Sequence, residues 1–142
     1  MDAAPFIANP SRRPISFHSY DSGATLPRQK GEELAITQLK TLKYKVLERN
    51  YKCPLGEIDI IARDKNTLVF IEVKTRATRD FGGPAAAVDP RKQRQLSRVA
   101  LTYLNQKKLF DIPARFDVVA IELTRSSPRI EVIRNAFELC YE

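Results

Sequence analysis

The sequence has little of what several common kinds of site require. Cys53 and Cys140 are its two cysteines, too few for a disulfide framework or a zinc site. His18, the single histidine, lies in a stretch without helical or strand periodicity, which argues against histidine-dependent catalysis. No apolar run approaches the roughly 20 residues of a membrane-spanning helix, and no secretory signal is recognisable. A cytoplasmic protein with reduced thiols is therefore expected.

Negative charge is in short supply as well. The 142 residues include 24 lysines and arginines against 17 aspartates and glutamates, so the net charge is +7. Such an excess favours a polyanionic partner, most commonly nucleic acid, with an anionic membrane surface as the alternative. The length predicts one domain that can bury a core.

The chain divides into two parts by composition. Residues 1–28 are rich in proline, serine and arginine and show no periodicity, so a flexible basic arm is predicted there. The folded domain is expected over residues 29–142. Its periodicity predicts two helices and five strands in the order αβββαββ, which cover residues 31–43, 44–50, 55–63, 68–74, 89–107, 115–123 and 129–134. This order predicts an α/β fold with a mixed central sheet flanked by helices.

Acidic residues interrupt two neighbouring apolar strands. Glu57 and Asp59 belong to the first, and Glu72 and Lys74 end the second. Residues two apart on a strand share a face. In a hairpin with a loop of two or four residues, Asp59 would face Glu72, and Glu57 would face Lys74. Like charges directly opposite destabilise a sheet, so a cation between Asp59 and Glu72 is expected.

Glu32 occupies an unusual place in the first predicted helix. At about 100° per residue it falls near the middle of the apolar stripe formed by Ala35, Ile36 and Leu39. One interpretation is a residue of the first turn that interacts favourably with the helix dipole. The other is a carboxylate aimed inward at the sheet.

Carboxylates clustered without histidine or cysteine suit a hard cation such as Mg²⁺ or Mn²⁺. A metal-bound water can act as a nucleophile, and Lys74 could orient or deprotonate that water. On the second long helix, Arg91, Arg94 and Arg98 form a basic stripe with Lys92 beside it, suited to a phosphate backbone. Together these features describe phosphodiester hydrolysis. The alternative is that these charges form a structural ion-pair network at the end of a solvated sheet.

The sequence resembles the restriction-endonuclease-like PD-(D/E)xK nuclease superfamily, especially its Holliday-junction-resolvase-like members. The matching signature is Asp59, followed after twelve residues by Glu72, Val73 and Lys74. More closely, the chain resembles the UPF0102 (YraN) family. The matching segments are 31–35, 56–62, 70–76 and 81–84, with Ala87-Val88, Lys92 and residues 115–119.

The superfamily resemblance implies a role for each matching position. Asp59, Glu72 and the Val73 carbonyl would be metal ligands, and Glu32 would approach the metal directly or through water. Lys74 would be the catalytic lysine. The resemblance assigns no role to Glu57.

Two residues depart from the patterns. Ile58 stands where the superfamily has its name-giving proline, and Arg28 stands where the narrower family often has glycine. Neither departure removes an expected ligand.

The leading hypothesis is a metal-dependent DNA endonuclease, selective for structures such as branched DNA and able to act as a homodimer. The alternatives are a nucleic-acid-binding protein of nuclease fold without its own catalytic activity, and a non-catalytic protein that interacts through its arm. The sequence leaves open the choice between DNA and RNA.

Overall fold

The computed structural model describes residues 28–77, 88–123 and 126–140. The predicted arm lies outside these ranges except for Arg28, and so does segment 81–84. The elements in chain order are α1 (Arg28–Thr41), β1 (Lys45–Cys53), β2 (Gly56–Asp64), β3 (Thr67–Ala77), α2 (Pro90–Lys107), β4 (Ala114–Leu123) and β5 (Arg129–Phe137). All seven predicted elements are present, in the predicted order.

Within the described ranges, the five strands form one sheet in the order β1-β2-β3-β4-β5. Strands β3 and β4 are parallel, whereas the other neighbouring pairs are antiparallel. A parallel pair needs a crossover connection, and α2 lies in that connection between β3 and β4. The sheet is therefore mixed, as predicted, and the α/β fold is consistent with a restriction-endonuclease-like core.

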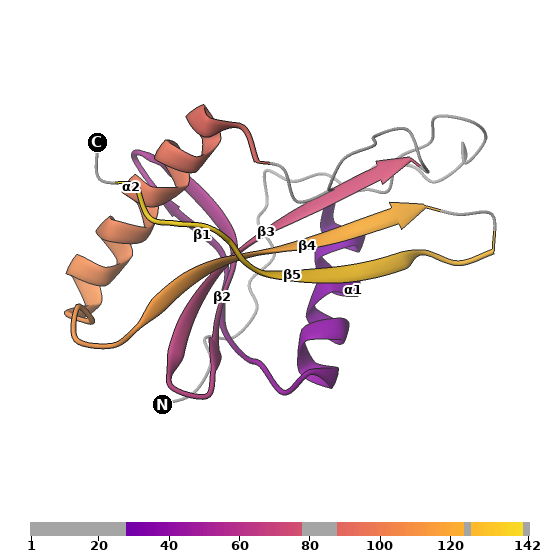
Figure 1. Ribbon diagram of the computed structural model, residues 1–142, viewed down its shortest axis with the longest axis horizontal. Coiled ribbons are helices and arrows are strands. Elements are labelled where there is room, and N and C mark those ends of the chain that lie inside the picture. Colours follow the sequence, from indigo (N-terminus) through magenta and orange to yellow (C-terminus); the bar gives the residue numbers. More distant parts are fainter. Residues whose placement is uncertain (1–27, 78–87, 124–125, 141–142) are drawn as a thin grey trace.

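The two helices cover opposite faces of a strongly twisted sheet (Figure 1). Beneath α1, the buried side chains of Ala35, Ile36 and Leu39 pack against apolar residues of β2, β3 and β4. The core beneath α2 includes Leu96, Ala100 and further buried residues of the same helix. Because both faces are covered, β3 is apolar on both sides over residues 68–71. No described helix is long and apolar enough to cross a membrane.

The β2–β3 hairpin has the predicted register. Asp64 pairs with Thr67, and the pairing continues to Ile60 and Ile71. Lys65 has a φ of 58°, the left-handed conformation typical of tight hairpin turns. Because the turn fixes the register, the acidic residues of both strands are brought to the same end of the hairpin.

Several boundaries differ from the predicted ones. α1 begins three residues before its predicted start, and β1 continues to Cys53 because its pairing with β2 extends to Gly56. β3 runs to Ala77 because its parallel pairing with β4 extends to Leu123. In both strands the interruption in local periodicity is overridden by hydrogen bonds to a neighbouring strand.

A network of hydrogen bonds around the buried Asp117 connects several parts of the sheet. Asp117 of β4 is 0% exposed and accepts hydrogen bonds from the Tyr44 hydroxyl (2.8 Å), Arg115 Nε (2.9 Å) and the Asn135 backbone N–H (2.9 Å). Arg115 also donates to Asp64 of β2 at 2.8 Å. Burial and the hydrogen bond to Asp117 raise the pKa of Tyr44 to about 12. The network therefore joins Tyr44, which directly precedes β1, to the end of β2, β4 and β5 around one hydrogen-bonded buried carboxylate.

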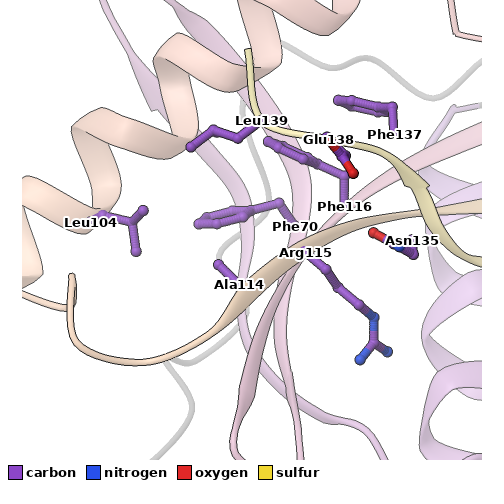
Figure 2. A pocket seen from close by; sticks show the side chains of 9 residues that line it. All are labelled: Phe70, Leu104, Ala114, Arg115, Phe116, Asn135, Phe137, Glu138 and Leu139. Carbon is purple, nitrogen blue, oxygen red and sulfur yellow. The ribbon is translucent and has the colours of Figure 1, made fainter. Parts of the chain in front are cut away.

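An aromatic cavity of about 270 Å³ lies near the start of β4 and the end of β5 (Figure 2). Its lining includes Phe70, Phe116 and Phe137, and the last two rings are stacked with centroids 4.4 Å apart. Ala114, which also lines it, pairs with the β3 residue four positions before Glu72. Glu32, Asp59 and Glu72 are not among the lining residues, so the cavity is distinct from the predicted acidic site.

Candidate functional site

Strands β2 and β3 lose their regular pairing where the acidic residues begin. The last paired residues are Ile60 and Ile71, so Asp59 and Glu72 come directly after the paired part of the hairpin. Asp59 is 6% exposed, and its Oδ2 accepts a hydrogen bond from the Val73 N–H at 2.9 Å. Asp59 therefore reaches across from β2 to the backbone of β3.

This hydrogen bond changes the expectation that Asp59 is opposed only by the charge of Glu72. The Asp59 carboxylate is not simply opposed by another charge, because a backbone donor partly compensates it. Neutralising Asp59 in the metal-free protein would relieve its repulsion with Glu72. It would also weaken the acceptor of the Val73 N–H, so the two effects oppose each other.

The ionisation of Glu72 is strongly disturbed by its surroundings. Burial, followed by the nearby charge of Asp59, raises the pKa of Glu72 to about 7. Lys92, Lys74 and Arg28 act in the opposite direction, and Lys92 Nζ lies 3.8 Å from Glu72 Oε2. A buried acid held beside a second acid, with cations around both, has the electrostatics common at functional sites.

Glu32 enters the same region from α1. The helix has no acidic residue in its first turn, so the helix-dipole interpretation of Glu32 is wrong. Its side chain is 2% exposed, as expected for an inward-facing carboxylate, and its Oε2 lies 3.6 Å from Arg28 Nε. Burial of Glu32 depends on a close approach of α1 to the sheet, which the preceding residue makes possible.

Gly31 allows this close approach. A Cβ atom at this position would lie 2.9 Å from Thr75 Oγ1 and 3.8 Å from Ile121 Cδ1. The first distance is too short for a side chain without movement of its surroundings. Glycine at position 31 therefore sets the distance between α1 and the end of β3.

We expect Gly31→Ala to destabilise the protein by about 1–3 kcal/mol through overpacking. In an ordinary helix interior the same change would stabilise by up to about 1 kcal/mol, so the sign is diagnostic. Urea unfolding measures the difference. Thr75→Ala in the Gly31→Ala background should recover most of the loss, whereas a Gly31→Ala protein more stable than the parent would contradict the close contact.

Arg28 lies among the carboxylates. Its Nη2 atom forms ion pairs with Glu57 and with Asp59 Oδ1, the latter at 3.2 Å, while its Nε faces Glu32. Burial lowers the pKa of Arg28, but the three carboxylates, with Asp59 foremost, raise it by more. One guanidinium thus connects acids from α1 and β2.

A groove of about 510 Å³ extends from this cluster. Arg28 forms one part of its lining, Lys52 and Glu57 of the β1–β2 hairpin a second, and Lys92 and Gln95 of α2 a third. Three cationic side chains therefore line a groove that contains Glu57 and lies beside Asp59. Sequence analysis did not identify Arg28, Lys52 or Gln95 as site residues, although the Arg28–Glu32 spacing of four residues is typical of a helical ion pair.

The predicted basic residues of α2 separate into two groups. Arg91, Arg94 and Arg98 are exposed, on the side of the helix opposite its buried residues. Lys92 instead lies at the acidic cluster beside Glu72. The structure therefore places Lys92 in the cleft and only the three arginines on the solvent side.

Glu32, Asp59, Glu72 and Lys74 come from three elements and lie in one region. Arg28 connects Glu32 to Asp59, and the charges of Asp59 and Lys74 both act on Glu72. The carboxylates and the Val73 carbonyl are oxygen donors, which suit Mg²⁺ or Mn²⁺. Among the described residues, no group of three or more histidine, cysteine, aspartate or glutamate side chains is already arranged to hold a metal.

Comparisons with known proteins show the family of this chain. The model of "Uncharacterised protein family UPF0102" matches residues 31–121. A UPF0102 protein of Geobacter sulfurreducens is 54% identical over 113 residues, which cover 79% of this chain and 88% of that protein. One from Geotalea daltonii is 57% identical over 112 residues (78% and 88%), and one from Geobacter metallireducens is 50% identical over 127 residues (89% and 100%). The matched region contains Glu32, Asp59, Glu72 and Lys74, and the chain belongs to the UPF0102 family.

Proposed function

We propose that this protein is a metal-dependent endonuclease that hydrolyses phosphodiester bonds of DNA. One observation carries the proposal: buried or half-buried carboxylates from α1, β2 and β3 meet where β2 and β3 lose their pairing. A stable fold gains little from such a concentration of like charge, because buried carboxylates are costly unless a cation compensates them. A divalent cation compensates two of these charges at once.

Each residue has a chemical role in this proposal. Asp59, Glu72 and the Val73 carbonyl would hold Mg²⁺ or Mn²⁺, with Glu32 reaching the ion directly or through water. The bound ion would polarise a phosphoryl oxygen and lower the pKa of a water molecule. Lys74, close enough to Glu72 to lower its pKa, would orient the attacking water or accept its proton.

Lys92 and the arginines of α2 would hold the substrate. Lys92 beside Glu72 can contact the phosphate nearest the reaction, whereas Arg91, Arg94 and Arg98 are placed for more distant phosphates. Their contacts would be electrostatic and therefore sensitive to salt.

Removing the three exposed arginines should weaken DNA binding and reduce its salt dependence. Each phosphate contact contributes about −0.9 to the slope of log K against log salt on duplex DNA. Arg91→Gln, Arg94→Gln and Arg98→Gln together should make the slope shallower by up to about 2.7. Fluorescence anisotropy at several salt concentrations measures this.

A control with the same loss of charge is Lys40→Gln, Lys43→Asn and Lys65→Asn, three exposed positions outside α2. This control should retain the parent slope. Equal slopes for the arginine triple variant and the parent would place the DNA-binding face elsewhere, with the arm and its Arg12 and Arg13 as the next candidates.

A second function is favoured by the position of Arg28. A guanidinium bonded to Asp59 and Glu57 compensates the acids without a metal. The same cluster could therefore be the stable core of a nucleic-acid-binding protein that cleaves nothing.

Cleavage assays separate the two functions. Labelled duplex, flap and four-way DNA, with RNA counterparts, are incubated with the protein in Mg²⁺, in Mn²⁺ and in chelator. Metal-dependent cleavage of any substrate supports the endonuclease, and preference for four-way DNA would define branched-structure selectivity. Binding without cleavage on every substrate supports the non-catalytic function. Sedimentation of the DNA complex tests whether a homodimer is the active form.

A further inference from the structure

We infer that Arg28 is a built-in cation of the carboxylate cluster, which a divalent metal ion displaces as it binds, and that the displaced guanidinium then receives a substrate phosphate in the adjoining groove. This inference rests on the proposed function, because it assigns the regulation of the same site. In this exchange, bound metal increases the affinity for phosphate, and bound phosphate increases the affinity for metal.

The contacts of Arg28 are those of a cation at the centre of the site. Its guanidinium bonds to Glu57 and Asp59 through Nη2, and it is within ion-pair distance of Glu32 through Nε. It also lowers the pKa of Glu72. Three of these acids, Asp59, Glu72 and Glu32, are proposed metal ligands. A metal ion among the same oxygens would lie beside a guanidinium of like charge, so the two cannot share the cluster without strong repulsion.

The position of Arg28 also allows its side chain to leave the carboxylate cluster. It is the first residue of α1, and its side chain is 55% exposed. Its ion pairs with described residues are those with Glu32, Glu57 and Asp59. Partly exposed ion pairs of this kind are weak individually, so a dication that binds several carboxylates can replace one monovalent group.

The groove offers the displaced side chain a new position. Lys52, Lys92 and Gln95 line it together with Arg28 itself and with Glu57, so a phosphate in the groove would meet mainly donor side chains. A phosphate there would be held by three cationic side chains, and the planar fork of arginine can donate two parallel hydrogen bonds to it. The metal releases Arg28 towards the phosphate, and the phosphate keeps Arg28 away from the metal site. By linkage, each ligand then increases the affinity of the other by the same factor.

The first test measures Mn²⁺ affinity by electron paramagnetic resonance of the free ion. Arg28→Gln should bind Mn²⁺ about tenfold more tightly than the parent, because a competitor held by several partly exposed ion pairs has been removed. The matched control is Lys30→Gln, an exposed residue of the same helix, which should keep the parent affinity. Arg28→Lys keeps the charge without the planar fork and should give an intermediate affinity, and it serves as the principal variant if Arg28→Gln does not fold.

The second test measures coupling, in a Lys74→Gln background so that no DNA is cleaved. Mn²⁺ should tighten binding of a DNA duplex to Lys74→Gln. The increase should be much smaller in Arg28→Gln/Lys74→Gln, where no guanidinium is released into the groove. Loss of coupling together with tighter Mn²⁺ binding is a result that a purely structural Arg28 would not give.

The outcomes distinguish this inference from the function on which it rests. Equal Mn²⁺ affinity in the parent and Arg28→Gln, both abolished by Glu72→Gln, would overturn the role of Arg28 and leave the metal site intact. Mn²⁺ binding that Glu72→Gln does not change, or no binding in any variant, would overturn the metal site and with it the exchange. Tighter Mn²⁺ binding in Arg28→Gln together with lost coupling supports both.

Discussion

Under the proposed function, Glu72→Gln is expected to reduce metal-dependent DNA cleavage by about a hundredfold or more, because it would remove a charged ligand of the metal ion that stabilises the transition state. Glutamine keeps the shape of glutamate and one oxygen acceptor, so the variant should fold. Single-turnover cleavage rates at saturating Mg²⁺ measure the loss, and a Mn²⁺ titration of the same protein should show weakened binding.

Lys74→Gln provides the matched comparison. A residue that positions or deprotonates water should lose a similar amount of cleavage while Mn²⁺ affinity stays close to that of the parent. Weakened metal binding therefore distinguishes Glu72 from Lys74 even where both proteins are inactive. Unchanged cleavage by Glu72→Gln would show that this carboxylate holds no essential metal.

Glu72→Gln should also change the stability of the metal-free protein, and the change should depend on pH. The pKa of Glu72 is raised above its ordinary value, to about 7, so the folded protein holds this proton more tightly than the unfolded chain. The resulting cost to the folded state is absent below pH 4.5 and grows as pH rises towards 7. In chelator, Glu72→Gln should therefore be more stable than the parent at pH 8, and the difference should disappear near pH 4. Melting curves at both pH values show this.

Asp117→Ala should be the most destabilising single change considered, with a loss of about 3–5 kcal/mol. The carboxylate is fully buried and accepts bonds from Tyr44, Arg115 and the Asn135 backbone, so its removal leaves several donors unsatisfied. Arg115 would also lose the partner that most strongly raises its pKa. Urea unfolding followed by circular dichroism measures the loss.

Asp111→Ala is the control for this change, since Asp111 is exposed in the connection before β4. It should alter the free energy of unfolding by no more than about 0.5 kcal/mol. A loss below about 1 kcal/mol for Asp117→Ala would mean that the network adds little to stability, and that Arg115 and Tyr44 find other partners.

The fold could be predicted from local patterns where those patterns were strong. Alternation of apolar residues in β2 and β3, with turn-forming residues between them, fixed the strands and their register. The helical angle of Glu32 put this acid within the apolar stripe, and the inward orientation, one of the two interpretations left open, is the one observed. Both predictions concern neighbours along the chain or across a short hairpin, where geometry follows directly from sequence.

Contacts between distant segments were not predictable in the same way. The pairing of Arg28 with Asp59 depends on how closely α1 approaches β2, and no local pattern specifies that distance. The partners of Asp117 come from the residue before β1, from β4 and from β5, although a lone acid within the apolar run Phe116–Ala120 is itself a signal that some partner exists. The loss of pairing between β2 and β3 beyond the Ile60–Ile71 pair was also not predicted, because alternation alone predicts continued pairing.

Crystallography with Mn²⁺ tests most directly whether the carboxylate cluster is a metal site. An anomalous difference map should contain a peak at about 2.0–2.2 Å from oxygens of Asp59, Glu72 and the Val73 carbonyl, with Arg28 withdrawn from Asp59. Arg28 still bonded to Glu57 and Asp59 at saturating Mn²⁺, with no anomalous peak among these acids, would contradict the metal site and the proposed hydrolysis.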